Sequence, residues 1–202
     1  MRLVDVHIEA AGGKLPEEVR RFLHEADERI ARFQQESRVP AFVPSDYPGA
    51  YRVLAAVADS PLARGMQFCE WGSGFGVVTC LASMVGFDAT GIEVSPELVE
   101  AARMLAEDAD LPVEFACGSF VPPGGDDRVH SIGEYAWFTT ESDYAYNDLG
   151  LDPSDMDLIF AYPWPDEEGM LGEIFCRYAG HGALLASYHG AGEFRIRRKL
   201  RK

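Results

Sequence analysis

A glycine-rich segment, Phe68 to Gly76, carries the clearest chemical signal in this sequence. An apolar stretch ends in a carboxylate at Glu70, and glycines follow at positions 72, 74 and 76. Because glycine has no Cβ, the backbone can turn sharply at these positions and lie almost against a ligand. A helix that begins after Phe75 would direct its unpaired N–H groups at the same ligand. The segment therefore predicts a loop that binds a nucleotide-type cofactor.

The spacing of the glycines separates two classes of cofactor. The dinucleotide fingerprint Gly-x-Gly-x-x-Gly/Ala needs a small residue at position 77, where this chain has Val77. The run is instead acidic-x-Gly-x-Gly-x-Gly, and it resembles the first motif of the class I S-adenosylmethionine (SAM) dependent methyltransferases. The resemblance covers about residues 66–189 and implies a doubly wound α/β domain, SAM as the cofactor and methyl transfer as the activity. A non-catalytic SAM-binding regulatory module and an NAD-linked oxidoreductase remain as alternatives.

The resemblance also implies which residues contact the cofactor. In the family, the glycine loop accommodates the methionine part of SAM and the preceding acid lies near its amino group. The matching positions here are Glu70, Gly72, Ser73, Gly74, Phe75 and Gly76. A carboxylate about 20 residues further on can bind both ribose hydroxyls, and Glu93 occupies that position. Its neighbour Val94 would pack on adenine. Where relatives carry Asp or Asn for the adenine amino group, this chain has Ser119 followed by Phe120.

A second group of candidate residues follows two later predicted strands. The run Ala161-Tyr162-Pro163-Trp164 resembles the Asp/Asn-Pro-Pro-Tyr motif of amino-group methyltransferases without its polar first residue, so it does not support amino-group methylation. Tyr162 and Trp164 would form an aromatic wall for a methyl or cationic group. His189 is a candidate general base, because imidazole titrates at about pH 6.5. A purely structural role for these aromatics and this histidine remains an alternative, and no residue cluster has the spacing of a metal site.

Alternation of strands and helices predicts a mostly parallel sheet with helices on both faces. The expected strands are residues 66–70, 89–94, 113–116, 158–162 and 183–188, and the expected helices are residues 77–85, 96–109 and 167–179. The ligand crevice of such a fold lies at the carboxyl ends of the strands, where the strand order reverses. The candidate residues above fall at or beyond such strand ends, so we expect them to line one crevice.

The remaining segments flank this core. Residues 1–62 form a predicted N-terminal extension with a strand at 4–8 and helices at 16–35 and 48–59, ahead of a SAM-binding domain at 63–202. Residues 121–156 form a long insertion or lid rich in aromatic and acidic residues. The C-terminal end is truncated relative to the resembling family. We expect the strand at 4–8 and one antiparallel strand near 194–198 to replace the missing hairpin, and the basic run Arg195–Lys202 to be a solvated terminus or an edge strand.

The composition restricts the partners. The 202 residues carry a formal net charge of −15, which is unfavourable for binding nucleic acid. The expected methyl acceptor is a small molecule or a protein side chain that is not polyanionic. Four cysteines (69, 80, 117 and 176) without a CxxC pair predict free thiols. No apolar run approaches the ~20 residues that span a bilayer, and the first residues do not resemble a signal peptide. We therefore expect a cytoplasmic protein with no membrane partner. The acceptor and the oligomeric state do not follow from the sequence.

Overall fold

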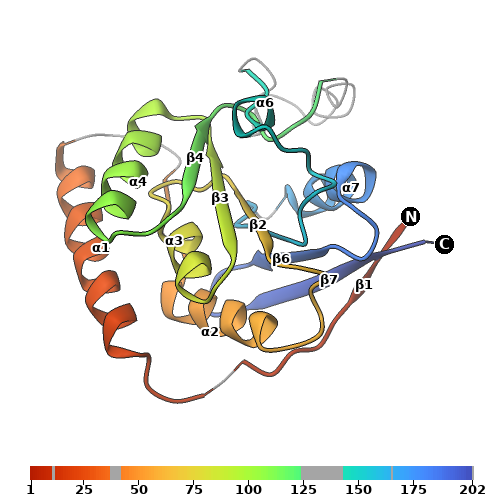
Figure 1. The fold of residues 1–202 in the computed structure, drawn as a ribbon, viewed down its shortest axis with the longest axis horizontal. Helices are drawn as coiled ribbons and strands as arrows, with labels where there is room; N and C mark the ends of the chain where they lie inside the picture. Colours follow the sequence, from red (N-terminus) through yellow and green to blue (C-terminus); the bar gives the residue numbers. More distant parts are fainter. Residues whose placement is uncertain (11, 37–41, 124–142, 165, 202) are drawn as a thin grey trace.

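A seven-stranded sheet forms the centre of the molecule in the computed structural model, which describes residues 1–10, 12–36, 42–123, 143–164 and 166–201 (Figure 1). Its strand order is β1-β7-β6-β5-β2-β3-β4. The strands are β1 (Arg2–Asp5), β2 (Gln67–Trp71), β3 (Asp88–Glu93), β4 (Glu114–Cys117), β5 (Leu158–Ala161), β6 (Leu184–Tyr188) and β7 (Phe194–Leu200). The helices are α1 (Glu17–Glu36), α2 (Tyr47–Ala58), α3 (Val77–Met84), α4 (Pro96–Asp108), α6 (Tyr146–Leu149) and α7 (Glu168–Tyr178).

The sheet is mostly parallel, as the sequence predicts. Strands β2 to β6 pair in parallel with their neighbours, whereas β7 runs antiparallel to β6 and β1 runs antiparallel to β7. Strand β2 lies between β3 and β5, with Trp71 paired to Ile92 on one side and to Ala161 on the other. The strand order therefore reverses beside β2, directly below the glycine loop.

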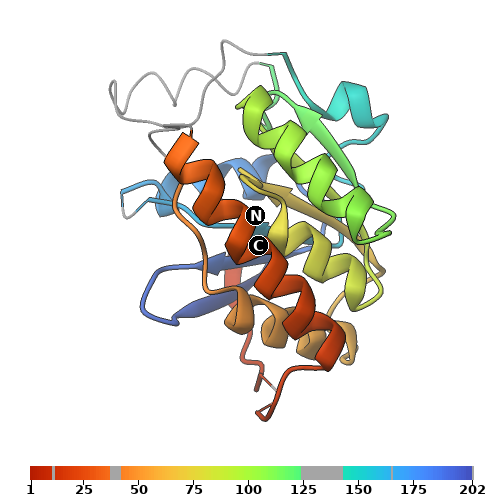
Figure 2. The same cartoon turned by 90° about the vertical axis from the view of Figure 1, so that its left-hand side faces the viewer.

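Helices cover both faces of the sheet, but unequally. Side chains of α1, α2, α3 and α4 share one buried cluster with Phe68 and Phe160, while α6 and α7 pack on the other face with Cys69 and Ile159. Figure 2 shows α1 lying outermost on the first face. Neighbouring residues of a strand point to opposite faces, so the apolar strands feed both clusters. This confirms the doubly wound α/β fold.

The two ends of the described chain meet at one edge of the sheet (Figure 1). The expected replacement of the hairpin is confirmed, since β1 pairs with β7 from Arg2↔Leu200 to Asp5↔Arg197. Strand β1 begins earlier than the predicted 4–8. Its limits are set by its pairing register with β7, and not by the alternation of apolar and polar residues in its own sequence. The expectation that Arg195–Lys202 is a solvated terminus or edge strand is wrong, because β7 is paired on both sides and Lys199 is buried.

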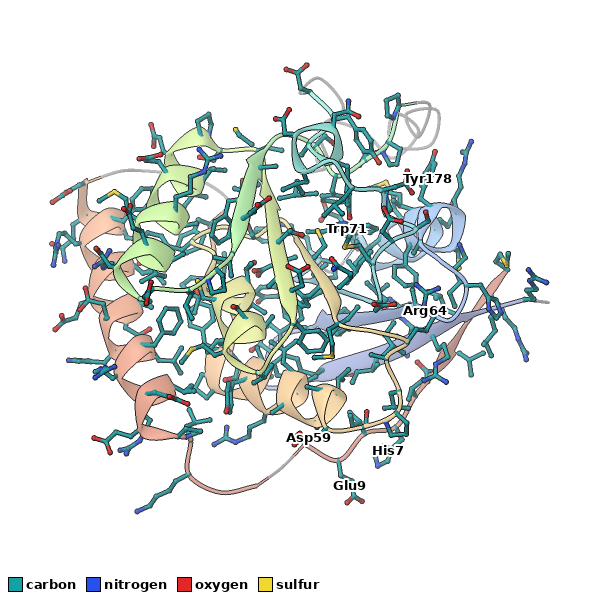
Figure 3. All side chains as sticks on the ribbon, viewed as in Figure 1. His7, Glu9, Asp59, Arg64, Trp71 and Tyr178 are labelled. Carbon is teal, nitrogen blue, oxygen red and sulfur yellow. The ribbon has the colours of Figure 1, made fainter. Side chains whose placement is uncertain are left out.

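Of the predicted insertion at 121–156, residues 124–142 lie outside the described part of the chain. Tyr146 from its described remainder is fully buried, and its hydroxyl accepts a hydrogen bond of 2.7 Å from the indole Nε1 of Trp71. Trp71 lies inside the molecule at the end of β2 (Figure 3). The insertion thus supplies part of the core beneath the predicted site.

Candidate cofactor and acceptor site

The glycine loop connects β2 to α3 and is held by its own backbone. Gly72, Gly74 and Gly76 have φ angles of +72°, +52° and +73°, in the left-handed region that favours glycine. The amides of Gly72 and Ser73 both donate to the carbonyl of Ile92 at 2.9 Å. The amide of Gly76 donates to the carbonyl of Ser73 at 2.8 Å. These backbone hydrogen bonds therefore hold the loop against β3 without the help of a ligand.

Glu93 joins the glycine loop to the next strand end. One of its carboxylate oxygens accepts from the amide of Gly74 and the other from the amide of Ser95, each at 2.9 Å. A carboxylate oxygen has two lone pairs, so both oxygens can still accept from the hydroxyls of a sugar. The predicted proximity of the glycine loop and Glu93 is thereby observed, with the distance set by a direct hydrogen bond.

Glu70 lies buried beneath the loop. Its Oε2 accepts from the amide of Thr79 at 2.8 Å and from the hydroxyl of Thr79 at 2.6 Å, at the start of α3. Burial raises the pKa of this carboxyl to about 8, against the lowering effect of the Thr79 hydrogen bonds. At neutral pH the carboxyl is therefore largely protonated, and a cation beside it would favour its ionised form.

A cavity of about 690 Å³ opens over these residues. One part of its wall comes from the loop and the ends of β2, β3 and β4, and includes Glu70, Gly72, Ser73, Gly74, Glu93, Val94 and Phe120. The other part is rich in aromatic rings and includes Phe42, Tyr47, Phe160, Tyr162, Trp164 and His189. The cavity thus lies where the crevice was predicted and has a size typical of ligand pockets.

Three of the predicted cofactor residues do not line this cavity. Phe75 is buried in the core, where its ring centroid lies 5.6 Å from that of Phe33. Gly76 begins α3, and a Cβ there would lie 2.5 Å from the ring of Phe115. Ser119 is buried, and its hydroxyl accepts from the amide of Val121 at 3.0 Å. These three residues shape the loops around the cavity.

Sequence reasoning missed several lining residues. They are Phe42, Val43, Ser45, Tyr47, Trp71, Ile92, Ser95, Leu98, Gly118, Phe160, Ala161, Pro163, Glu167 and Leu171. Six of them directly adjoin residues that the motifs had already marked: Trp71, Ile92, Ser95, Gly118, Ala161 and Pro163. Residues 42–47 are different, because they precede the glycine loop by 25 or more positions. Their signal was the proline-rich stretch between α1 and α2, whose aromatic and hydroxyl residues suit a binding segment.

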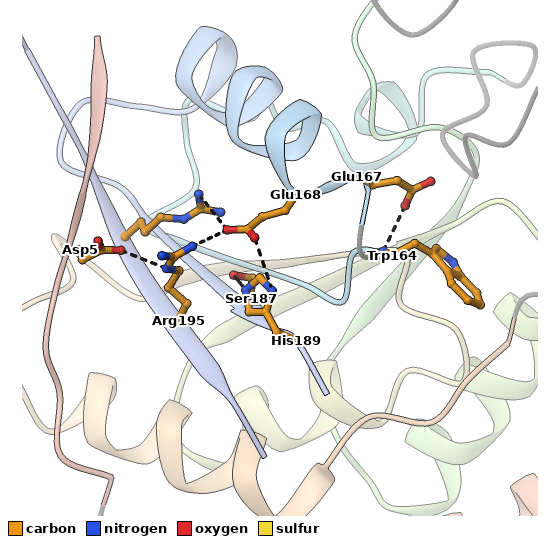
Figure 4. Close-up of polar contacts among 8 residues, drawn as sticks. Asp5, Trp164, Glu167, Glu168, Ser187, His189 and Arg195 are labelled. Atoms are coloured by element: carbon orange, nitrogen blue, oxygen red, sulfur yellow. Dashed lines mark hydrogen bonds and ion pairs between the residues drawn. The ribbon is translucent and has the colours of Figure 1, made fainter. Parts of the chain in front are cut away.

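His189 lies in the cavity wall with both ring nitrogens already partnered. Its Nε2 is 2.8 Å from the hydroxyl of Ser187, and its Nδ1 is 3.7 Å from the carboxylate of Glu168 (Figure 4). Glu168 also accepts from Arg195 at 2.6 Å, which together with the cations around it lowers the pKa of this carboxyl against the effect of burial. Arg195 in turn lies 3.3 Å from Asp5 of β1. Ser187 is fully buried, so it cannot itself contact a substrate. Its hydroxyl instead fixes the orientation of the imidazole ring of His189.

The two aromatic residues after β5 occupy different environments. Tyr162 packs edge-on against Tyr188, with ring centroids 4.7 Å apart. Trp164 is 41% exposed, and its amide donates to Glu167 at 3.3 Å (Figure 4). Tyr162 is therefore a fixed part of the wall, while Trp164 stands at the rim of the cavity.

Two hydroxyls at the cavity have no hydrogen-bond partner in the part of the chain that the structure describes. The buried Oγ atoms of Ser45 and Ser73 are both unpaired among the described residues. Buried polar groups are nearly always paired in folded proteins, so each of these hydroxyls marks a place where a ligand or water can bind.

All four cysteines are free. No group of three or more metal-ligating side chains occurs in the part of the chain that the structure covers. None of the helices there is both long and apolar enough to cross a membrane.

No protein-family model matches the sequence, and no curated protein matches it. Solved methyltransferase structures share its fold. An RNA methyltransferase from Salinibacter ruber in complex with S-adenosyl-L-homocysteine is 21% identical over 78% of this chain and 92% of its own, with a TM-score of 0.53. A methyltransferase from Geobacter sulfurreducens is 14% identical over 94% and 93%, with a TM-score of 0.54. The O-methyltransferase TomG from Streptomyces achromogenes, in complex with SAM, is 16% identical over 86% of this chain and 66% of its own, with a TM-score of 0.52. The fold is therefore that of the class I methyltransferases.

Proposed function

We propose that this protein is a SAM-dependent methyltransferase that uses the cavity over the glycine loop for both the cofactor and the acceptor. The observation that carries the proposal is the meeting of the glycine loop and Glu93 on one side of that cavity, with Tyr162, Trp164 and His189 on the other. The similarity in fold to methyltransferases solved with SAM or S-adenosylhomocysteine supports the same cofactor.

The residues present fit this cofactor. A Cβ at Gly72 would meet no atom within 4 Å, so the space above the loop is open for a ligand. Glu93 retains lone pairs for the ribose hydroxyls, and exposed Val94 offers an apolar surface to the adenine. The buried carboxyl of Glu70 would become ionised beside the amino group of the methionine part. Gly72, Ser73, Gly74 and Phe120 would complete the cofactor side.

Methyl transfer places few chemical demands on the protein. SAM supplies a methyl group on a positively charged sulfur, which an acceptor attacks in line. The chain must hold both partners and exclude water, and Tyr162 and Trp164 would shield the reacting centre. His189 would take the acceptor's proton on Nε2 after this nitrogen leaves the hydroxyl of Ser187. Glu168 would hold the opposite nitrogen and stabilise the charged ring.

A non-catalytic SAM-binding module is the second candidate. Two observations favour it: Ala161 gives the β5 end no polar side chain, and both nitrogens of His189 are already engaged. The NAD-linked alternative has no support in the fold comparisons. A cytoplasmic location and a small-molecule or protein acceptor remain predictions. The acidic and aromatic cavity wall supports a neutral or cationic acceptor over the RNA that the Salinibacter ruber neighbour modifies.

Two measurements test the proposal. S-Adenosylhomocysteine at ~100 times its dissociation constant should add about 2.7 kcal/mol of stability and raise Tm by several degrees, with NADH as the control. Stabilisation by NADH alone would contradict the assignment of the cofactor. Methyl-labelled SAM with a fractionated cell extract then separates enzyme from sensor. Label in a small-molecule or protein fraction supports the proposal, label in RNA contradicts the predicted acceptor class, and no labelled fraction favours the sensor.

A further inference from the structure

The segment of residues 42–47, called the elbow below, contacts the glycine loop directly. A Cβ placed on Gly74 would lie 2.8 Å from the ring of Phe42, and that ring is also 6.1 Å, centroid to centroid, from Phe75. At the other end of the elbow, the phenol of Tyr47 is buried within electrostatic reach of Glu70. The elbow therefore covers the part of the cavity expected to receive the methionine end of the cofactor.

The glycine loop itself has few donors left for that end. The amides of Gly72, Ser73 and Gly76 donate to backbone carbonyls, and the amide of Gly74 donates to Glu93. An α-carboxylate bound over the loop would receive no hydrogen bond from these four amides unless an existing bond broke. Carboxylates in proteins need such donors, so they must come from side-chain hydroxyls: that of Ser73 on the loop itself, or others on the opposite part of the wall.

The elbow offers two hydroxyls at this place. The Oγ of Ser45 is buried without a hydrogen-bond partner among the described residues, so rotating it toward the cavity breaks no hydrogen bond. The phenol of Tyr47 forms a hydrogen bond with the backbone of Ser45. Both side chains belong to the same short stretch of the cavity wall.

We propose that Ser45 and Tyr47 bind the α-carboxylate of the cofactor through their hydroxyls. This proposal rests on the proposed use of SAM. Glu70 lies beneath the same end of the cavity, so the amino group and the carboxylate of the methionine part contact different elements. The elbow thereby recognises the amino-acid part of the cofactor, and the ends of β3 and β4 recognise the nucleoside.

The test compares two ligands that differ only in this part. S-Adenosylhomocysteine carries the amino acid, whereas 5′-methylthioadenosine is the same thioether nucleoside without it. Ser45→Ala and Tyr47→Phe should each weaken binding of S-adenosylhomocysteine about tenfold, as expected for a lost hydrogen bond to a charged group, and leave 5′-methylthioadenosine unchanged. Isothermal titration calorimetry measures both dissociation constants on the full chain.

Matched controls lie outside the cavity lining. Ser83→Ala on α3 and Tyr51→Phe on α2 remove the same hydroxyls from half-buried positions and should change neither affinity. Equal weakening of both ligands by the elbow variants, or no change in either, would overturn the role of the elbow. If the wild-type protein bound neither ligand, the proposed function itself would fall.

Discussion

The glycine-loop side and the elbow side of the cavity differ in which polar groups hold their shape and which remain for a ligand. Four backbone amides of the loop have partners within the protein, and Glu93 bridges two elements. On the elbow, the hydroxyl of Ser45 has no partner among the described residues. Paired backbone amides keep the loop in shape without a ligand, whereas an unpaired hydroxyl, Ser45 on the elbow or Ser73 on the loop, is completed by one. We therefore expect substitutions on the loop side to change the shape of the site, and those on the elbow to change its contacts.

Gly74→Val should have the largest effect, because it damages both walls. A β-branched side chain is strained at a φ of +52°, and its Cβ would collide with the ring of Phe42. We expect no measurable binding of S-adenosylhomocysteine by calorimetry and a lower Tm. Gly12→Val is the control, since no atom lies within 4 Å of a Cβ at that position. Binding at wild-type affinity would show that the cofactor does not lie against this loop.

His189→Ala should affect turnover without affecting the cofactor wall. Loss of a general base typically lowers the rate about 100-fold or more. We expect that loss in methyl transfer to a labelled extract fraction, together with an unchanged dissociation constant for S-adenosylhomocysteine. Undiminished transfer would leave His189 a structural residue held by Ser187 and Glu168.

Gly72→Ala isolates the open space above the loop. The added methyl group would meet no protein atom, so a loss of affinity beyond that caused by backbone strain at a φ of +72° comes from the ligand. We expect S-adenosylhomocysteine to bind about tenfold more weakly, equivalent to about 1.4 kcal/mol. Gly150→Ala is a matched control, because Gly150 has a similar φ of +63° and open surroundings but does not line the cavity. Similar losses of affinity in both variants would point to backbone strain instead.

Glu70→Gln should change the pH dependence of stability, apart from any loss of the proposed contact with the cofactor. Burial raises the pKa of Glu70 from 4.5 to about 8, so the folded protein binds a proton that the unfolded chain has released. This contribution to the free energy of unfolding is complete below pH 4.5 and is lost as the pH rises to about 8. The slope is at most about 1.4 kcal/mol per pH unit. Urea unfolding at pH 5.5 and 7.5 should show a smaller decline for Glu70→Gln than for the wild-type protein. The exposed Glu114→Gln is the control, and equal declines for Glu70→Gln and wild type would contradict a protonated Glu70.

Local signals in the sequence were sufficient for the loop side. The glycine spacing and the acid at position 93 describe short-range geometry, and the structure joins them by one hydrogen bond. The sequence signals for two helix starts were equally local. Asp46 caps α2 by accepting from the amide of Gly49, and Ser95 caps α4 by accepting from the amide of Leu98. The fold class followed from the order of these elements.

The elbow side could not be predicted in the same way. Phe42 reaches Gly74 only because α1 and α2 pack on α3, and no periodicity in the sequence encodes that approach. Phe75, Gly76 and Ser119 lie outside the cavity lining for a related reason. A loop residue can face either the ligand or the core, and motif matching alone does not tell which.

The pairing of β1 with β7 has a consequence for how the protein is made. Residues 2–5 find their partners only at residues 197–200, so β1 leaves the ribosome well before β7 has been made. At a synthesis rate of about 5–20 residues per second, that interval is about 10–40 s. During this time Leu3 and Val4 have no strand to cover them, and the edge of the nascent sheet is open to chaperones or to another growing chain.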